Sequence, residues 1–223
     1  MEIKMGGILK STWEMLHDGR FLKKALMIAC PVALQGMLNT IVNMVDTLMI
    51  GGLGSTAIAA VGLANKVFFV FSLLVFGIVS GGGILAAQFW GSGDVKNIRK
   101  VLGLCVMLAM VGAMFFVVPA LTVPRMVMRI FTTSEGSIEL GAKYLRIAAL
   151  SYPFIALTNV YVAMLRATNK VVFPVICSCI AIVVNICLNY VLIFGKFGAP
   201  TMGVAGAACA TLTARCIEVT LVL

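Results

Sequence analysis

The chain has 223 residues, of which 61% are hydrophobic and 11% are charged, and its mean hydropathy is +1.10. A soluble domain is about half apolar and about a quarter charged. This composition therefore excludes a water-soluble globular protein and predicts a chain solvated by lipid. The net charge is +9, but the basic residues gather beside apolar stretches, which indicates membrane topology signals and argues against a nucleic-acid partner.

Residues 1–24 precede the first apolar stretch. They carry charges at both ends and no continuous apolar core, so they are not a cleavable signal peptide. Helical spacing relates Met5, Leu9, Thr12, Trp13 and Leu16, which favours a short amphipathic helix on the membrane surface; the alternative is a frayed tail. We predict two parts: a cytoplasmic N-terminal segment, 1–24, and a transmembrane lobe, 25–223.

Six segments are long and apolar enough to cross a bilayer as α-helices, because a span needs about 20 such residues. They are residues 25–50, 57–89, 101–123, 140–166, 171–195 and 202–223. We predict an all-α, polytopic membrane protein built as a six-transmembrane-helix bundle. The last segment runs to Leu223 without a polar flank, so we expect it to be truncated and followed by a second lobe in the same orientation, the parallel-repeat plan of several transporters.

The basic residues orient the predicted bundle. The side that holds the N-terminus collects ten of them, namely Lys4, Lys10, Arg20, Lys23, Lys24, Lys96, Arg99, Lys100, Arg166 and Lys170. The opposite side collects five, namely Arg125, Arg129, Lys143, Arg146 and Lys196. By the positive-inside rule we predict a multi-pass protein of the cell membrane with a cytoplasmic N-terminus.

Asp46 is the only acidic side chain within the first five predicted spans. A carboxylate inside a membrane costs several kcal/mol unless it is paired, hydrated or protonated. Gln35, Asn39, Asn43 and Asp46 are spaced by 4, 4 and 3 residues, so they share one helix face. This polar stripe predicts a water-filled cavity or a cation path. The alternative is a hydrogen-bonded contact between helices.

A second polar stripe occurs in the fifth span, where Ser178, Asn185 and Asn189 share a face. Amide and hydroxyl oxygens coordinate Na⁺ or hold water beside a protonatable carboxylate. We predict that H⁺ or Na⁺ binds at a site formed by Asp46, Asn43, Asn159, Asn185, Asn189 and Thr211. We predict that the cavity is further lined by Gln35, Asn39, Lys66 and Ser178.

Three other charged side chains need an interpretation. Lys66 lies about nine residues into the second span, where three roles stay open: ion partner of Asp46, substrate-site cation, or a side chain that reaches the membrane surface. Arg215 and Glu218, three residues apart, predict a local helix pair near the inner surface without a catalytic role.

Catalytic and metal-binding patterns are absent from the predicted spans. The one histidine, His17, precedes the first span, no Walker loop occurs, and the seven cysteines form no Cys-x-x-Cys pair. We therefore expect no enzyme activity, no cofactor, no disulfide and no structural metal. Pro31, Pro153 and Pro174 lie within or at the start of spans, where each can bend a helix.

Several short motifs, taken in order, resemble the N-terminal lobe of multidrug and toxic compound extrusion (MATE) transporters. They are NMVDTLMIG at 43–51, AAVGLA at 59–64, WGSGD at 90–94, LRATN at 165–169, NICLNYVLIFG at 185–195 and GVAGAA at 203–208. The resemblance spans about residues 21–223. Asn169 stands where the family usually has Gly, and Lys66 is not expected from the family pattern.

The resemblance implies one lobe of a twelve-helix antiporter that exports small organic, often cationic, drugs in exchange for H⁺ or Na⁺. Asp46 occupies the position of the family's proposed cation site in the first helix, and Asn185 and Asn189 match a fifth-helix pair that helps to form it. Some members have Asp at the position of Asn189, so this chain has one ionisable group there. The alternatives are a flippase for a lipid-linked sugar, which needs several cavity cations for pyrophosphate, and a membrane scaffold without transport.

Overall fold

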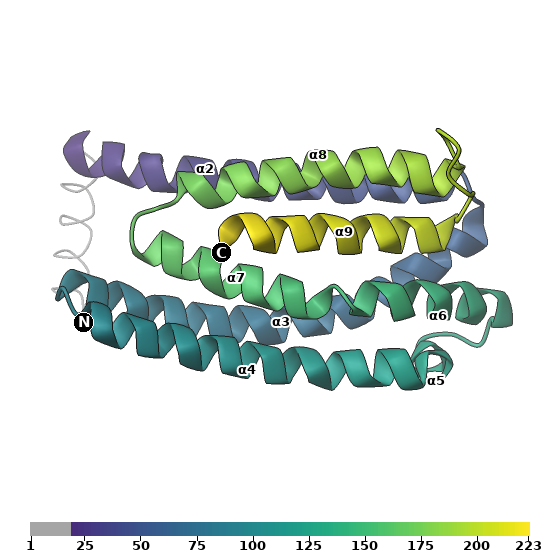
Figure 1. Ribbon diagram of the computed structural model, residues 1–223, viewed down its shortest axis with the longest axis horizontal. Helices are drawn as coiled ribbons and strands as arrows, with labels where there is room; N and C mark the ends of the chain where they lie inside the picture. Colours follow the sequence, from purple (N-terminus) through teal and green to yellow (C-terminus); the bar gives the residue numbers. More distant parts are fainter. Residues whose placement is uncertain (1–18) are drawn as a thin grey trace, which may run out of the picture.

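The computed structural model describes residues 19–223, without the side chains at positions 20, 21, 24, 25 and 28 (Figure 1). The predicted surface helix at 1–24 therefore lies almost wholly outside the described residues. Within 19–223 the structure contains eight α-helices and no strand. The helices are α2 Gly19–Gly51, α3 Ser55–Gly91, α4 Val95–Thr122, α5 Pro124–Arg129, α6 Glu135–Ala149, α7 Tyr152–Ala167, α8 Val172–Phe194 and α9 Val204–Val222.

The helices match the six predicted segments in order, which confirms the all-α membrane fold. Among the described residues, α3, α4, α8 and α9 are each long and apolar enough to cross a membrane, and the bent pair of α6 and α7 meets the same criterion when the two are taken together. The first predicted segment lies within α2, whose 33 residues exceed the about 20 that one span requires. Pro31 lies inside α2, which continues past it.

The fourth predicted segment, 140–166, is not one helix. It is divided between α6 and α7, whose axes differ by 47°. Pro153 has no backbone N–H and cannot bond to the carbonyl of Ala149, the residue at which α6 ends. At the break the carbonyl of Ala148 accepts from both the backbone N–H of Ser151 at 2.9 Å and the Ser151 hydroxyl at 2.6 Å.

The region 124–139, which the sequence predicts as a loop, contains two helical stretches. Pro124 opens the six-residue helix α5, because a proline at the first helical position removes an N–H that has no partner there anyway. Helix α6 begins at Glu135, five residues before the predicted start of the span. The chain therefore enters the bundle again through a short surface helix.

The core lies where α3, α4, α6 and α7 pack together in the lower part of Figure 1. Phe71 of α3 is fully buried and stacks on Tyr152 of α7, with ring centroids 4.6 Å apart and planes 8° apart. Alanines fill the narrow contacts on α4, where Ala109 and Ala113 are fully buried. Small residues allow helices to approach closely in lipid, where no hydrophobic effect drives helices together.

Helices α8 and α9 form a second close pair, and α2 lies beside α8. Gly206 on α9 sits against the backbone of Leu192, since a Cβ there would lie 2.6 Å from the Leu192 carbonyl oxygen. Gly195 ends α8 in the left-handed conformation, with φ of 65°, as glycine commonly does at helix C-termini. These glycines bring α8 and α9 together along one side of the bundle.

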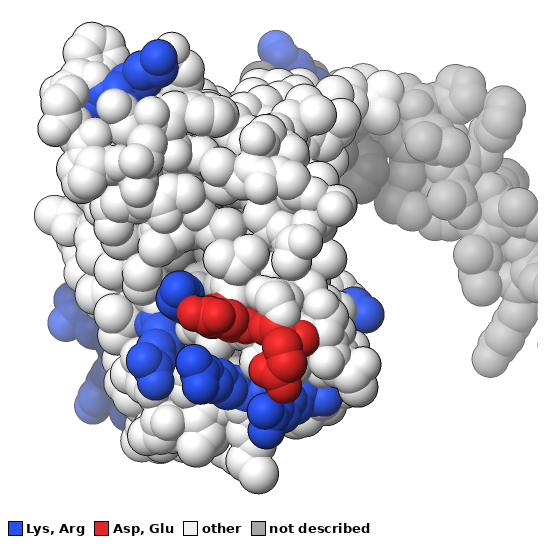
Figure 2. All heavy atoms as spheres, turned by 90° about the vertical axis from the view of Figure 1, so that its right-hand side faces the viewer, with Lys and Arg blue, Asp and Glu red and all other residues white. Residues whose placement is uncertain are grey.

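The outer surface divides into an apolar body and charged ends. Large apolar side chains such as Phe76, Val111 and Phe115 are more than two-thirds exposed along α3 and α4, as expected for surfaces that face lipid. Figure 2 views the end of the molecule at the right of Figure 1, where basic and acidic side chains gather in one region. Two ion pairs form at α5 and α6: Arg129–Glu135 at 3.2 Å and Lys143–Glu139 at 3.1 Å.

Candidate functional site

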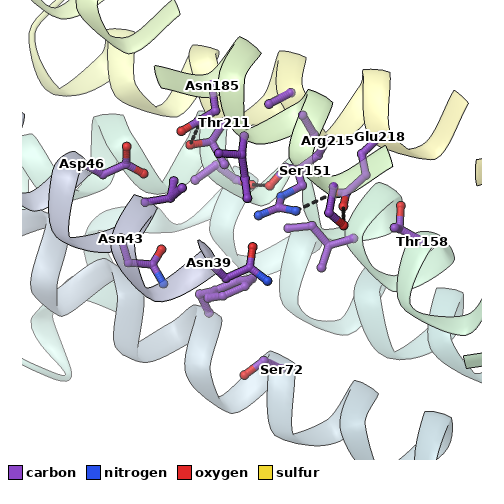
Figure 3. A pocket seen from close by; sticks show the side chains of 18 of the residues that line it. Asn39, Asn43, Asp46, Ser72, Ser151, Thr158, Asn185, Thr211, Arg215 and Glu218 are labelled. Carbon is purple, nitrogen blue, oxygen red and sulfur yellow. Dashed lines mark hydrogen bonds and ion pairs between the residues drawn. The ribbon is translucent and has the colours of Figure 1, made fainter. Parts of the chain in front are cut away.

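A cavity of about 760 Å³ lies between α2, α3, α6, α7, α8 and α9 (Figure 3). Eight of the ten residues predicted for the site line it, namely Gln35, Asn39, Asn43, Asp46, Asn159, Ser178, Asn185 and Thr211. The polar stripe of α2 therefore faces the cavity over its whole length. The ninth residue, Asn189, lies fully buried next to Asp46.

Asp46 begins a chain of side-chain hydrogen bonds that crosses three helices. Its Oδ1 accepts from Nδ2 of Asn189 on α8 at 2.5 Å, and the same nitrogen donates to Oδ1 of Asn185 at 3.2 Å. Asn185 in turn contacts the Thr211 hydroxyl on α9 at 3.5 Å. The first and fifth predicted spans thus meet at the carboxylate, near the end of α2.

The Asn189 amide has a further property. Its Nδ2 serves both Asp46 and Asn185, while its Oδ1 is buried without a hydrogen-bond partner among the described residues. A buried carbonyl oxygen without a partner costs about 1–3 kcal/mol. This free oxygen belongs to the same amide whose Nδ2 contacts the Asp46 carboxylate, so the polar network around Asp46 retains an unused acceptor.

A second polar network lies farther along the cavity. Gln35 of α2 donates to the Ser178 hydroxyl at 2.6 Å, and Ser178 donates to Oε1 of Glu218 on α9 at 2.7 Å. Arg215 holds the other carboxylate oxygen at 2.5 Å. Figure 3 shows Arg215 and Glu218 at some distance from Asp46 along the same cavity.

The sequence interpretation of Arg215 and Glu218 is therefore incomplete. They do form a pair within one helix, but Glu218 is only 3% exposed and both residues line the cavity. The missing information is tertiary, because Ser178, which bonds to Glu218, lies 40 residues away in the sequence. A buried carboxylate requires such partners.

Arg166 is the functional candidate that sequence reasoning missed. It counted only as a basic residue of the inner side, yet it lines the cavity and donates from one terminal nitrogen to Oε1 of Gln35 at 2.6 Å. One signal was present: Arg166 follows Asn159 by seven residues, two helical turns, which puts both on one face of α7.

Lys66 does not belong to the cavity. Its side chain is exposed, and the neighbouring Asn65 lines the cavity in its place. Successive residues of a helix point about 100° apart, so a displacement of one position moves a side chain off a face. Among the described residues Lys66 forms no ion pair with Asp46, and of the three predicted roles a side chain at the outer surface fits its position.

The charged groups of the cavity balance. The lining contains two carboxylates, Asp46 and Glu218, and two guanidinium groups, Arg166 and Arg215. Apolar helical spans around a polar, charge-balanced cavity define a polytopic α-helical membrane protein. The chain belongs to the MatE family, whose model matches residues 31–191 and confirms the resemblance found in the sequence motifs.

Curated relatives carry related descriptions. The chain is 33% identical over 195 residues to the probable multidrug resistance protein NorM of Thermotoga maritima, covering 86% of this chain and 42% of that protein. It is 32% identical over 191 residues to the probable multidrug resistance protein YoeA of Bacillus subtilis, covering 82% and 40%. The chain thus spans less than half the length of the relatives that it matches.

Solved structures share the fold. One, described as the outward-facing conformation of a multidrug resistance MATE family transporter of the MOP superfamily, matches with a TM-score of 0.81 and 23% identity, over 90% of this chain and 44% of that one. An inward-facing conformation of such a transporter matches with a TM-score of 0.75 and 23% identity, over 89% and 44%. The bundle is therefore the fold of one part of these longer chains.

Proposed function

We propose that this chain forms the N-terminal lobe of a cation-coupled transporter that exports organic, often cationic, drugs across the cell membrane. The observation that carries the proposal is the contact of Asp46 with Asn189 in the wall of a polar cavity. Membership of the MatE family and the multidrug resistance proteins among the relatives support the same activity. A second lobe, matching the remaining length of the relatives, closes the open side of the cavity.

Asp46 is the proposed acceptor of the coupling ion. As a carboxylate it attracts an organic cation into the cavity, and it loses that attraction when H⁺ or Na⁺ neutralises it. Asn189 bonds to it through Nδ2, and the Oδ1 atoms of Asn185 and Asn189 are the amide oxygens of the same network. Ion loading from outside thus releases the drug, and drug loading from inside requires that the ion has left.

The contact between α2 and α8 offers a way to transmit this change. Asp46–Asn189 and Gln35–Ser178 link the two helices at residues with the same sequence separation of 143, so α2 and α8 run parallel in register. Neutralising Asp46 weakens one of the two links. Since an ion shifts a conformational equilibrium only by its different affinity for the two states, the two states must differ at this contact.

The substitution Asp46→Asn in the full-length transporter tests the proposal. It keeps the size of the side chain and one oxygen that can accept from Asn189, but it removes the charge that the coupling ion neutralises. We expect ion-driven efflux of ethidium from cells to fall to the level of cells without the transporter, while the protein remains in the membrane. The matched control is Glu135→Gln, since Glu135 lies on the surface and outside the cavity. Undiminished efflux by Asp46→Asn refutes the assignment.

The flippase alternative is weaker. Pyrophosphate recognition needs an excess of positive charge along the cavity, whereas the lining balances two arginines against two carboxylates. A scaffold without transport needs no polar cavity at all. In that case the joint replacement of Asn39, Asn43 and Asp46 by leucine leaves the protein fully functional, whereas the proposed transporter loses efflux.

A further inference from the structure

Arg166 is a cavity cation that the proposed coupling steps do not use. One terminal nitrogen donates to Gln35, and its Nε is buried without a hydrogen-bond partner among the described residues. None of the three ion pairs formed within residues 19–223 includes it. A guanidinium stays charged and presents five N–H donors, so most of its donors have no partner among the described residues.

The other charges of the cavity are distributed unevenly. Arg215 is neutralised by Glu218 at 2.5 Å, which leaves Asp46 and Arg166 as the charges without an ion-pair partner among the described lining residues. Arg166 binds Gln35, which lies eleven residues before Asp46 on α2. At 1.5 Å per residue, Gln35 and Asp46 are about 17 Å apart along α2, so Arg166 and Asp46 lie toward opposite ends of the cavity. The cavity thus has a negative end and a positive end.

Aromatic side chains lie in the lining as well. Phe68, Phe69, Tyr144 and Tyr152 all contribute to it, and the rings of Phe68 and Tyr152 lie 5.8 Å apart. Aromatic faces bind flat rings and organic cations. A cavity of about 760 Å³ lies in the range that holds drug-sized molecules.

We propose that Arg166 binds an anionic group, such as a carboxylate, of the transported molecule. The cavity then takes aromatic zwitterions whose cationic part faces Asp46 and whose acidic part faces Arg166. A guanidinium and a carboxylate form two parallel hydrogen bonds, which gives both affinity and orientation. Gln35 positions Arg166, because its carbonyl holds the guanidinium while its amide is tied to Ser178. This inference rests on the proposed efflux function.

A pair of dyes with one skeleton tests the inference: the free-acid rhodamine, which is a zwitterion, and its methyl ester, which is a cation. Binding of both to the purified full-length transporter is measured in uncharged phosphatidylcholine, where no lipid headgroup carries a net charge. We expect Arg166→Gln to weaken binding of the free acid about tenfold, and binding of the ester less than twofold. Arg146→Gln, a surface arginine of α6, is the matched control and leaves both affinities unchanged.

Gln35→Glu supplies a second, independent variant. It places a carboxylate where the side-chain carbonyl of Gln35 already accepts from Arg166. The new carboxylate then forms an ion pair with Arg166, while the arginine itself is unchanged. We expect the same selective loss of free-acid binding as with Arg166→Gln. Retained binding of the ester shows that each variant is folded.

Three results overturn the inference. If Arg166→Gln weakens binding of the free acid and of the ester equally, Arg166 does not bind an anionic group of the substrate, and the proposed efflux function is unaffected. A loss that appears only after anionic lipid is added assigns Arg166 to a lipid headgroup. Failure of the wild-type protein to bind or transport either dye contradicts the efflux function, and the subsite falls with it.

Discussion

Nδ2 of Asn189 lies 2.5 Å from Oδ1 of Asp46, although 143 residues separate them in the sequence. The same nitrogen also donates to Asn185, one turn earlier on α8, so a single amide bonds to a residue of α2 and to a residue of its own helix. A hydrogen bond to a charged group contributes about 1.5–3 kcal/mol. Asn189 therefore stabilises the ionised form of Asp46, and in the proposed mechanism it opposes neutralisation of the carboxylate by the coupling ion.

This contact predicts different effects for two asparagines. Asn189→Leu removes the hydrogen bond to Asp46, and we expect the ion concentration for half-maximal efflux to change by about tenfold or more. Asn43 lines the cavity, but its side chain forms no hydrogen bond within the described residues. Asn43→Leu should therefore change the ion concentration for half-maximal efflux less than threefold. Efflux is measured in vesicles across a series of Na⁺ concentrations and pH values. Equal effects of the two substitutions contradict the assigned geometry.

The buried pair of Glu218 and Arg215 leads to a prediction about stability. Glu218→Gln leaves the guanidinium without its anion, and we expect a loss of roughly 1–3 kcal/mol. This is below the full cost of breaking a buried pair, because the Arg215 side chain is 36% exposed. The double variant Glu218→Gln with Arg215→Gln should recover part of the loss. Thermal unfolding of the purified full-length protein measures both.

The exposed pair Lys143–Glu139 is the control for that experiment. Its side chains are 63% and 58% exposed, so Glu139→Gln should leave the melting temperature almost unchanged. If Glu218→Gln is as harmless as Glu139→Gln, the pair in the cavity does not stabilise the lobe.

The sequence was sufficient for features that depend on one helix at a time. The stripe from Gln35 to Asp46 follows from helical spacing, and the structure places that face in the cavity. The break before Pro153 has a local cause in the sequence, the missing N–H of the proline. The resulting angle of 47° between α6 and α7 could not be predicted from it. Spacing along one segment carries this kind of information because neighbouring turns define a face.

Features that depend on contacts between helices were not predictable in the same way. Glu218 looked like half of a local pair, and only its packing against α8 and α2 shows a buried carboxylate bonded to Ser178. Arg166 looked like a surface charge at the end of a span. Lys66 was expected in the cavity, but the rotation of α3 puts Asn65 there. A sequence pattern does not fix the rotation of one helix against another.

The orientation of the lobe remains a prediction that fusions can test. Gly93 lies in the turn between α3 and α4, and Phe197, 92% exposed, lies in the loop between α8 and α9, at the opposite end of the bundle in Figure 1. With a cytoplasmic N-terminus, alkaline phosphatase fused after Phe197 should be active and after Gly93 inactive. Green fluorescent protein fused at the same positions should give the reverse. Activity of the phosphatase after Gly93 contradicts the predicted orientation.

The close approach of α8 and α9 at Gly206 predicts a substitution that the lobe does not tolerate. The Cβ of Gly206→Ala would lie 2.6 Å from the carbonyl oxygen of Leu192, and backbone atoms cannot move aside as a flexible side chain does. We expect a loss of about 1–3 kcal/mol and a lower melting temperature of the full-length protein. Gly103→Ala on α4 is the matched control, because a Cβ there meets nothing within 4 Å. Because Thr211 and Glu218 lie on the same helix as Gly206, efflux should fall together with stability. A Gly206→Ala protein that melts like the Gly103→Ala protein contradicts the close packing of α8 against α9.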